Sequence, residues 1–111
     1  MEILTLMTKK DAFDKFASGI LKEERRYITP STQKKFIDVT PTQVTIRIYD
    51  AIRFICGNKK DASKVLIKIN STELDYEPDE DGYIQLEEDD SGNLHIIEAS
   101  MIYSLGDILK E

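Results

Sequence analysis

The chain has 111 residues, 41% of them hydrophobic and 32% charged, which is an ordinary globular composition and argues against disorder of the whole chain. We expect one domain over residues 1–111. No apolar run approaches the roughly 20 residues of a membrane-spanning helix, residues 1–7 lack the basic flank of a secretory signal, and the single cysteine, Cys56, excludes an internal disulfide. These exclusions favour the cytoplasm.

The net charge of −6 is divided unevenly along the chain. Residues 1–68 hold 14 Lys and Arg against 8 Asp and Glu, whereas residues 69–111 hold one against 13. Such asymmetry is expected where an acidic half meets a basic partner, where the two halves neutralise each other, or where an acidic face serves solubility.

The first predicted element of regular structure is an amphipathic helix over residues 8–21. Phe13, Phe16 and Ile20 recur there at helical spacing, so they would share one apolar face. The charged residues that follow are interpreted as the solvated end of this helix. Residues 1–7 are compatible with a short strand or with a disordered lead.

A second, central helix is predicted over residues 40–57, after a loop at 27–35 and a short strand at 36–39. Capping signals at both ends support it. The alternating β-branched residues at 44–49 leave a strand open as the alternative. The apolar stripe of the helix would consist of Val44, Ile48, Ala51, Ile52 and Ile55.

From residue 64 onward the apolar residues alternate, which is the strand period. Val65, Ile67 and Ile69 predict one strand. Gly82 and Gly92 supply the positive φ that tight turns need, so the acidic segments around them are predicted to be turns of a β-meander. The strands of this meander are expected at residues 74–76, 83–87 and 94–98.

A last helix is predicted over residues 100–109, with Ser100 as its N-cap. The expected fold is therefore α+β: three helices packed on one face of a mostly antiparallel sheet of four or five strands, with the meander preceding the last helix. The apolar stripe of that helix would consist of Met101, Ile102, Leu105, Ile108 and Leu109.

The acidic turns hold a faint repeat with a step of ten residues, in which residues 77–86 match 87–96. Within the first copy, Glu77-x-Asp79-x-Asp81-Gly82-x-Ile84-x-x-x-Glu88 resembles the EF-hand calcium loop, and the resemblance implies oxygen ligands for calcium. Glutamate replaces the usual first aspartate, Pro78 follows it, and neither flank predicts a helix. We therefore interpret both copies as acidic hairpin turns.

Reactive side chains are few in this sequence. Cys56 and His95 fall short of the four ligands of a zinc site; Cys56 is interpreted as a small buried residue and His95 as an exposed strand residue. The five glycines are scattered and form no phosphate-binding loop. We expect no enzyme activity, no metal and no cofactor.

The acidic residues of the two turns, with the strand between them, predict a negative surface that attracts a basic protein. The protein would be a small non-catalytic inhibitor or immunity protein, such as a nucleic-acid mimic, that occludes a basic site on a nuclease or another nucleic-acid-handling enzyme. Tyr76 or Tyr83 would be an aromatic anchor. The predicted contact residues are Glu77, Asp79, Asp81, Tyr83, Glu87, Glu88, Asp89 and Asp90.

Two alternatives stay open, and neither involves a membrane. A calcium-responsive module would use the acidic turns. A nucleic-acid-binding regulator would use the basic N-terminal two-thirds of the chain, with the acidic turns as an internal cover. The basic residues that could converge in that case are Lys34, Lys35, Arg47, Arg53, Lys59, Lys60 and Lys64.

Overall fold

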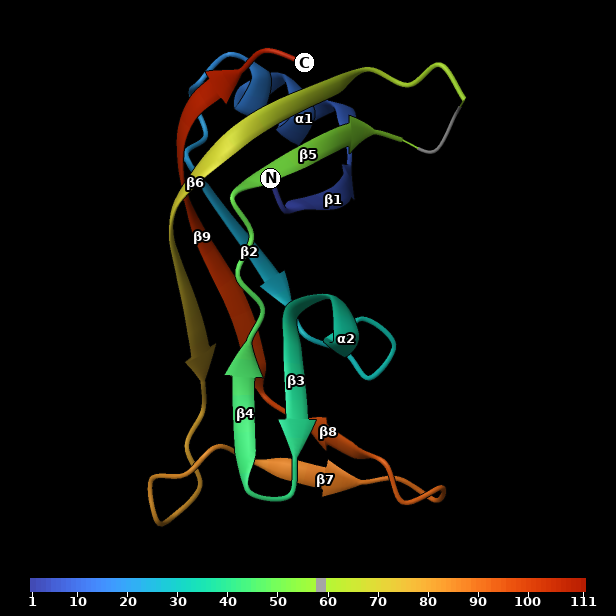
Figure 1. Cartoon of the computed structure of the whole chain (residues 1–111), viewed down its shortest axis with the longest axis vertical. Helices are drawn as coiled ribbons and strands as arrows, with labels where there is room; N and C mark the ends of the chain where they lie inside the picture. The colour runs from blue at the N-terminus through green and yellow to red at the C-terminus, as the bar shows by residue number, and fades with distance from the viewer. Residues whose placement is uncertain (58–59) are drawn as a thin grey trace. The chain divides into compact units, whose positions relative to one another are not determined.

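The computed structural model of the chain describes residues 1–57 and 60–111 (Figure 1). Strands dominate this part of the chain, and neither of the helices found in it is long and apolar enough to cross a membrane. In chain order, the elements are β1 (Ile3–Thr8), α1 (Lys10–Ala17), β2 (Glu23–Tyr27), α2 (Gln33–Phe36), β3 (Ile37–Thr40), β4 (Gln43–Ile46), β5 (Ala51–Cys56), β6 (Lys64–Tyr76), β7 (Leu86–Glu88), β8 (Leu94–Ile96) and β9 (Ala99–Leu109).

The predicted fold class is wrong, because two of the three predicted helices are strands. The segment 40–57 contains β4 and β5, and the segment 100–109 lies within β9. The helices of the described residues are α1 and the four-residue α2, which falls where a loop was predicted. The protein is built mainly from β-structure.

The error at residues 40–57 has a physical cause in β5. Ala51, Ile52 and Phe54 are all fully buried, so the strand is covered on both faces and its sequence is apolar except for Arg53. Such a sequence satisfies a helical stripe as well as a strand. The supposed N-cap at Thr40 faces Gln43 across the β3–β4 hairpin, whose turn is Pro41-Thr42.

The error at residues 100–109 has the opposite cause. Met101, Tyr103 and Leu105 are buried at every second position of β9, which is a strand period. The remaining apolar residues, among them Ile102 and the exposed Ile108, filled the gaps and mimicked a helical stripe.

The first helix is confirmed, but it ends early. Beyond Ala17 the chain closes in a Schellman motif: the N–H of Ile20 donates to the carbonyl of Lys15, and Gly19 takes a φ of +78°. The glycine therefore ends α1 instead of weakening its interior. The charged run after it is strand β2, not the solvated end of a helix.

The remaining short strands agree better with the sequence. Residues 1–7 contain β1, the predicted strand at 36–39 is β3, and the alternation from Val65 begins β6. The segment 74–76 belongs to the same long β6. The last two meander strands, β7 and β8, are each three residues long and form an antiparallel hairpin.

A five-stranded sheet has the order β1-β5-β6-β9-β2, and β3–β4 and β7–β8 are separate hairpins. Strand β1 runs parallel to β5, which pairs antiparallel with β6. The chain divides into unit 1 (Met1–Glu24, Ile48–Thr72, Tyr103–Glu111) and unit 2 (Arg25–Arg47, Glu73–Ile102). The expectation of a single domain stays a prediction.

The core of unit 1 lies between α1 and its sheet. Phe16 of α1 stacks on Phe54 of β5 with ring centroids 4.1 Å apart and planes 9° from parallel. Leu4 and Leu6 of β1 are also buried there, next to Ile52 of the neighbouring strand. Such burial stabilises the fold by about 1.5–3 kcal/mol for each large apolar side chain.

The core of unit 2 is smaller and joins α2 to three strands. Phe36 and Ile37, at the junction of α2 and β3, are buried, as is Ile96 of β8. Met101 of β9 completes this apolar set, and the Ile28 N–H donates to the Ala99 carbonyl, 2.9 Å away. This core carries the hairpin on which the acidic residues lie.

Candidate docking surface

The two acidic turns of unit 2 have the same hydrogen-bond pattern. In the first turn, Oδ1 of Asp79 accepts the backbone N–H groups of Asp81 and Tyr83, each at 2.9 Å. The Asp79 N–H donates to the Tyr83 carbonyl, and the Gly82 N–H donates to the Asp79 carbonyl. Gly82 has a φ of +88°, which explains the glycine at that position.

The second turn reproduces this pattern ten residues later. Oδ1 of Asp89 accepts the N–H groups of Ser91 and Asn93, each at 2.9 Å, and Gly92 has a φ of +82°. The faint sequence repeat is therefore one turn used twice. The geometry also accounts for the EF-hand-like spacing, because the aspartate that opens each turn binds backbone N–H groups. Among the described residues, no three acidic, His or Cys side chains gather as metal ligands.

The second turn has an additional contact through His95. The Nε2 atom of His95 lies 2.7 Å from Oδ2 of Asp89, so both carboxylate oxygens of Asp89 are engaged. The histidine, together with the backbone N–H groups of the turn, lowers the pKa of Asp89 to about 2. His95 is half-buried rather than exposed as predicted, and its Nδ1 has no partner within the described residues.

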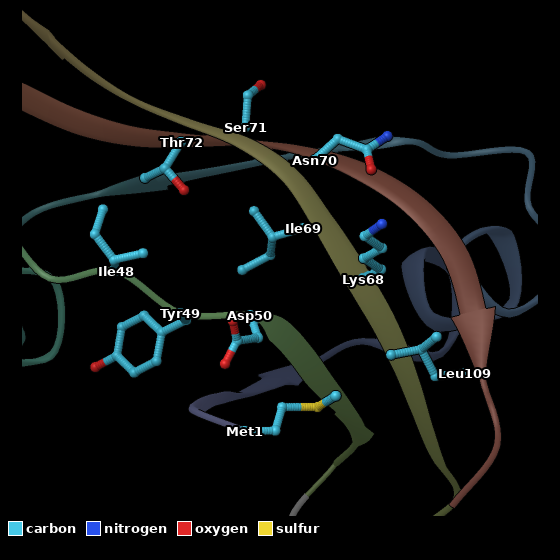
Figure 2. A pocket seen from close by; sticks show the side chains of 10 residues that line it. All are labelled: Met1, Ile48, Tyr49, Asp50, Lys68, Ile69, Asn70, Ser71, Thr72 and Leu109. Atoms are coloured by element: carbon cyan, nitrogen blue, oxygen red, sulfur yellow. The ribbon is translucent and has the colours of Figure 1, made fainter.

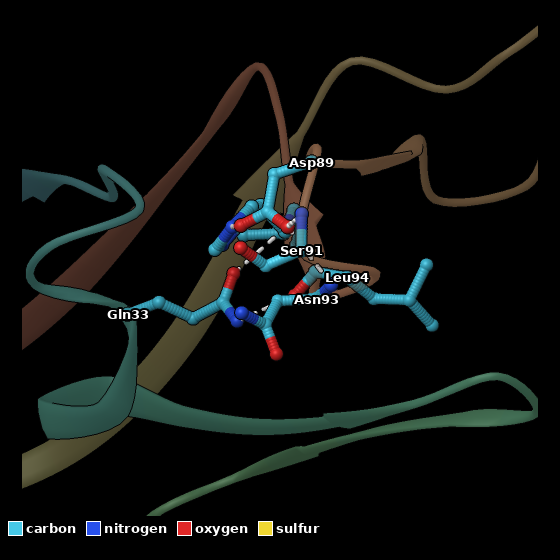
Figure 3. A network of polar contacts seen from close by, with 7 residues as sticks. Gln33, Asp89, Ser91, Asn93 and Leu94 are labelled. Carbon is cyan, nitrogen blue, oxygen red and sulfur yellow. Dashed lines mark hydrogen bonds and ion pairs between the residues drawn. The ribbon is translucent and has the colours of Figure 1, made fainter.

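Gln33 of α2 fixes the hairpin to the core. Its Nε2 donates to the Leu94 carbonyl at 3.1 Å, and its Oε1 accepts the Ile96 N–H at 2.8 Å (Figure 3). The amide thus pairs with β8 as a neighbouring strand would. Gln33 is only 8% exposed, so water cannot easily replace it. Nothing in the local sequence marks Gln33 for this role, because its partner Leu94 lies 61 residues away.

All eight predicted contact residues lie in unit 2 and are exposed. The two turns stand at opposite ends of β7, so they flank the strand instead of forming one tip (Figure 1). The six peptide steps from Tyr83 to Asp89 span at most about 22 Å. The carboxylates therefore lie in the β6–β7 connection, on β7 and in the turn of the β7–β8 hairpin, and they follow the strand instead of gathering at one tip.

The charge of this region is not neutralised from within. Unit 2 contains 5 Lys and Arg against 12 Asp and Glu, a net charge of −7, and two of its arginines are committed: Arg25 to Asp75 and Arg47 to Asp38, each at 2.9 Å. The ion pairs of Lys10, Arg25, Arg47 and Arg53 involve none of the following contact residues: Glu77, Asp81, Glu87, Glu88 and Asp90.

An open hollow of about 340 Å³ lies beside the first turn. The β3–β4 hairpin turn lines it on one side, and Tyr76, Tyr83 and Ile84 line it on the other. Tyr83 is 71% exposed and Tyr76 37%, which is high for aromatic side chains. The predicted anchors thus line the same hollow, next to the first acidic turn.

Sequence reasoning missed two parts of this surface. Glu80 is an exposed carboxylate in the first turn, at the variable position after Asp79, and the Asp-x-x-Gly spacing could have revealed it. The wall formed by Pro41 and Val44 had no sequence signal, because it depends on the non-local position of the β3–β4 hairpin.

The basic residues of the nucleic-acid hypothesis are divided between the units. Lys34, Lys35 and Arg47 belong to unit 2, whereas Arg53, Lys60 and Lys64 belong to unit 1. Arg53 forms an ion pair with Glu111. Lys59 lies outside the described residues.

A hollow of about 650 Å³ lies in unit 1. Figure 2 shows Ile48, Tyr49 and Ile69 around it, with Asp50 beside Tyr49. The Asp50 carboxylate accepts the backbone N–H of Glu2 at 2.7 Å, which is a structural role. Cys56 is a partly exposed free thiol of β5, not a helix residue.

Comparisons with protein families, with curated proteins and with solved structures find no match to this chain.

Proposed function

We propose that the protein is a small non-catalytic binding protein that docks the acidic surface formed by β7 and the turns at its two ends onto a basic site of another protein and thereby occludes that site. The observation that carries this proposal is the set of exposed carboxylates on β7 and in the turns at its two ends, in a unit of net charge −7. A nuclease or another nucleic-acid-handling enzyme is the partner class that fits, because its substrate site is basic. The protein acts as an inhibitor or immunity protein in the cytoplasm, where Cys56 stays reduced.

The rigidity of the turns supports the proposal. The carboxylates of Asp79 and Asp89 are committed to backbone N–H groups, so they hold the turns in shape and leave docking to their neighbours. Pre-formed turns lose little conformational entropy on binding. The contacting groups would be the free carboxylates together with Tyr83, whose ring and hydroxyl suit the centre of an interface.

The test is an inhibition assay on a panel of nucleases with basic clefts. Nuclease activity is measured as cleavage of a fluorescent oligonucleotide. The wild-type chain should inhibit at least one of these nucleases. The variant Asp81→Lys/Glu88→Lys/Asp90→Lys should lose this inhibition, because it reverses free carboxylates and spares the aspartates that shape the turns. The matched control Glu23→Lys/Asp61→Lys/Asp107→Lys makes the same change in net charge at exposed positions outside unit 2 and should still inhibit.

Two outcomes would contradict the proposal. Equal loss of inhibition in both variants would mean that net charge alone matters, without a docking surface. Binding of the free oligonucleotide by the wild-type chain, with no effect on any nuclease, would favour the nucleic-acid-binding regulator instead. A gel shift at low salt distinguishes that result from simple inactivity.

A further inference from the structure

The hollow beside the first acidic turn has the size and the lining of a site for one side chain. Its volume of about 340 Å³ is at the small end of the range for ligand clefts, which is about 300–1,000 Å³. Tyr76 and Tyr83 line it on one side, and residues 41–44 of the β3–β4 hairpin line it on the other. A side chain that enters the hollow would therefore lie against two tyrosines.

Both walls of the hollow are held by hydrogen bonds of their own. On one side, the Asp79 N–H donates to the Tyr83 carbonyl, and Oδ1 of Asp79 accepts the Tyr83 N–H. On the other side, Thr40 pairs with Gln43 in the β3–β4 ladder, and the Thr40 hydroxyl donates to the Gln43 carbonyl at 3.2 Å. The walls are thus formed before a partner arrives, and a pre-formed site loses little conformational entropy when its ligand enters.

The charge next to the hollow is negative. Glu77 directly follows the lining residue Tyr76 in the chain, and its side chain is exposed. Asp81 directly precedes the lining residue Gly82, and Asp81 is exposed as well, as is its neighbour Glu80. Aromatic faces attract cations, and nearby carboxylates add to this attraction. A positively charged side chain therefore suits the hollow better than an apolar one.

We propose, resting on the proposed function, that the hollow is an arginine subsite: it receives one arginine side chain of the basic partner, which stacks on Tyr83. The guanidinium group is planar, stacks on aromatic rings and binds carboxylates through two parallel hydrogen bonds. The ammonium group of lysine is a more strongly hydrated point charge, so it gains less from an aromatic wall. In the complex, the N–H groups of the arginine reach the carboxylates of the first turn.

Titration of the full chain with N-acetylarginine amide tests the subsite without the partner, with NMR of the tyrosine ring signals as the readout. The comparison probes are the amides of N-acetyllysine, N-acetylleucine and the neutral isostere N-acetylcitrulline, all at one ionic strength. The arginine probe should bind about threefold or more tightly than each of the others. Absence of binding by the arginine probe, or binding of any other probe with equal or higher affinity, would overturn the proposal.

Variants of two exposed tyrosines locate the binding. Tyr83→Leu should weaken binding of the arginine probe about threefold or more, read from the Tyr76 ring, because it removes an aromatic face and keeps both backbone hydrogen bonds of residue 83. Tyr83→Phe keeps the ring and should bind like the wild-type chain. Tyr27→Leu is the matched control, since Tyr27 is 57% exposed in the same unit but does not line the hollow.

The control should leave binding of the arginine probe unchanged. Arginine binding that survives Tyr83→Leu, or that is lost equally in Tyr27→Leu, would contradict the subsite. Circular dichroism of each variant confirms that the fold is retained.

The nuclease assay separates the subsite from the proposed function. A chain that inhibits a nuclease but shows no preference for the arginine probe overturns the subsite and keeps the proposed function. A chain that prefers the arginine probe but inhibits no nuclease overturns the proposed function and keeps the subsite. Where both hold, Tyr83→Leu should weaken inhibition about threefold or more, and Tyr27→Leu should leave it unchanged.

Discussion

The two acidic turns of unit 2 are alike in shape and different in attachment. Both begin with an aspartate that accepts two backbone N–H groups and both contain a glycine with positive φ. The first connects β6 to β7, and its tip is open to the hollow beside Tyr83. The second closes the β7–β8 hairpin, and His95 holds its aspartate from the strand.

The comparison shows that the conformation of a turn and its attachment to the rest of unit 2 have different causes. The turn shape follows from local Asp and Gly chemistry, since it forms both with and without a hairpin around it. Support comes from distant residues: the buried Gln33 holds β8, whereas near the first turn the partly exposed Gln85 donates one hydrogen bond, of 2.8 Å, to the Glu77 carbonyl. We therefore expect the second turn to depend more strongly on the rest of unit 2.

The largest expected effect comes from removing the buried amide. Gln33→Leu leaves the Leu94 carbonyl and the Ile96 N–H without partners and should lower the free energy of unfolding by about 2–3 kcal/mol. Gln85→Leu removes one exposed hydrogen bond and should cost about 1 kcal/mol or less. Urea unfolding measures both. Equal losses would refute the difference in support.

The glycines test whether the two turns have the same shape. Gly82→Ala and Gly92→Ala should each cost about 1–2 kcal/mol, because an L-residue with a Cβ is strained at φ of +88° or +82°. Neither Cβ would meet an atom closer than 3.5 Å, so the penalty is conformational in both. Thermal or urea unfolding should give the same loss for the two variants. A clear difference would mean that the turns are not equivalent.

The stability of the protein in acid should depend on the contact between His95 and the second turn. Because the pKa of Asp89 in the folded protein is about 2, below its ordinary value of 3.8, ionised Asp89 stabilises the fold above about pH 4, and this stabilisation is lost as the pH falls towards 2. His95→Leu removes the hydrogen bond that is the main cause of the lowered pKa, so the loss of stability between pH 4 and pH 2 should become smaller. Urea unfolding between pH 7 and pH 2 measures it. An unchanged acid limb would show that His95 does not hold the carboxylate.

The smallest expected effect comes from making the turns identical in charge. Ser91→Asp gives the second turn the Asp-x-Asp-Gly sequence of the first and should change the free energy of unfolding by no more than about 0.5 kcal/mol, because Ser91 contributes its backbone N–H. The added carboxylate should make binding of a basic partner more sensitive to salt. A large loss of stability would show that the serine side chain shapes the turn.

Features that depend on neighbouring residues could be predicted from the sequence, whereas features that depend on distant segments could not. The turns at Gly82 and Gly92 were predicted because Asp and Gly act on their immediate neighbours. The strand β5 was mistaken for a helix because burial of its faces depends on elements that are distant in the chain, such as α1, whose Phe16 stacks on Phe54. An apolar run carries no record of which neighbours cover it.

The same distinction applies to the candidate site. Its carboxylates and Tyr83 were predicted because exposed charge and turn sequence are local properties. The role of Gln33 and the hollow beside the β3–β4 hairpin were missed, because each needs segments that the fold brings together. The sequence predicts a strand between the two turns but does not show how that strand is oriented in space. For this reason the position of the turns at opposite ends of β7 was not predicted.

The most direct test of the docking surface is the salt dependence of binding to an inhibited nuclease, measured by titration calorimetry. For the wild-type chain, affinity should fall steeply as salt rises, and Asp81→Lys/Glu88→Lys/Asp90→Lys should abolish binding while Glu23→Lys/Asp61→Lys/Asp107→Lys keeps it. Affinity that is indifferent to salt, or that survives reversal of the hairpin carboxylates, would contradict the central claim.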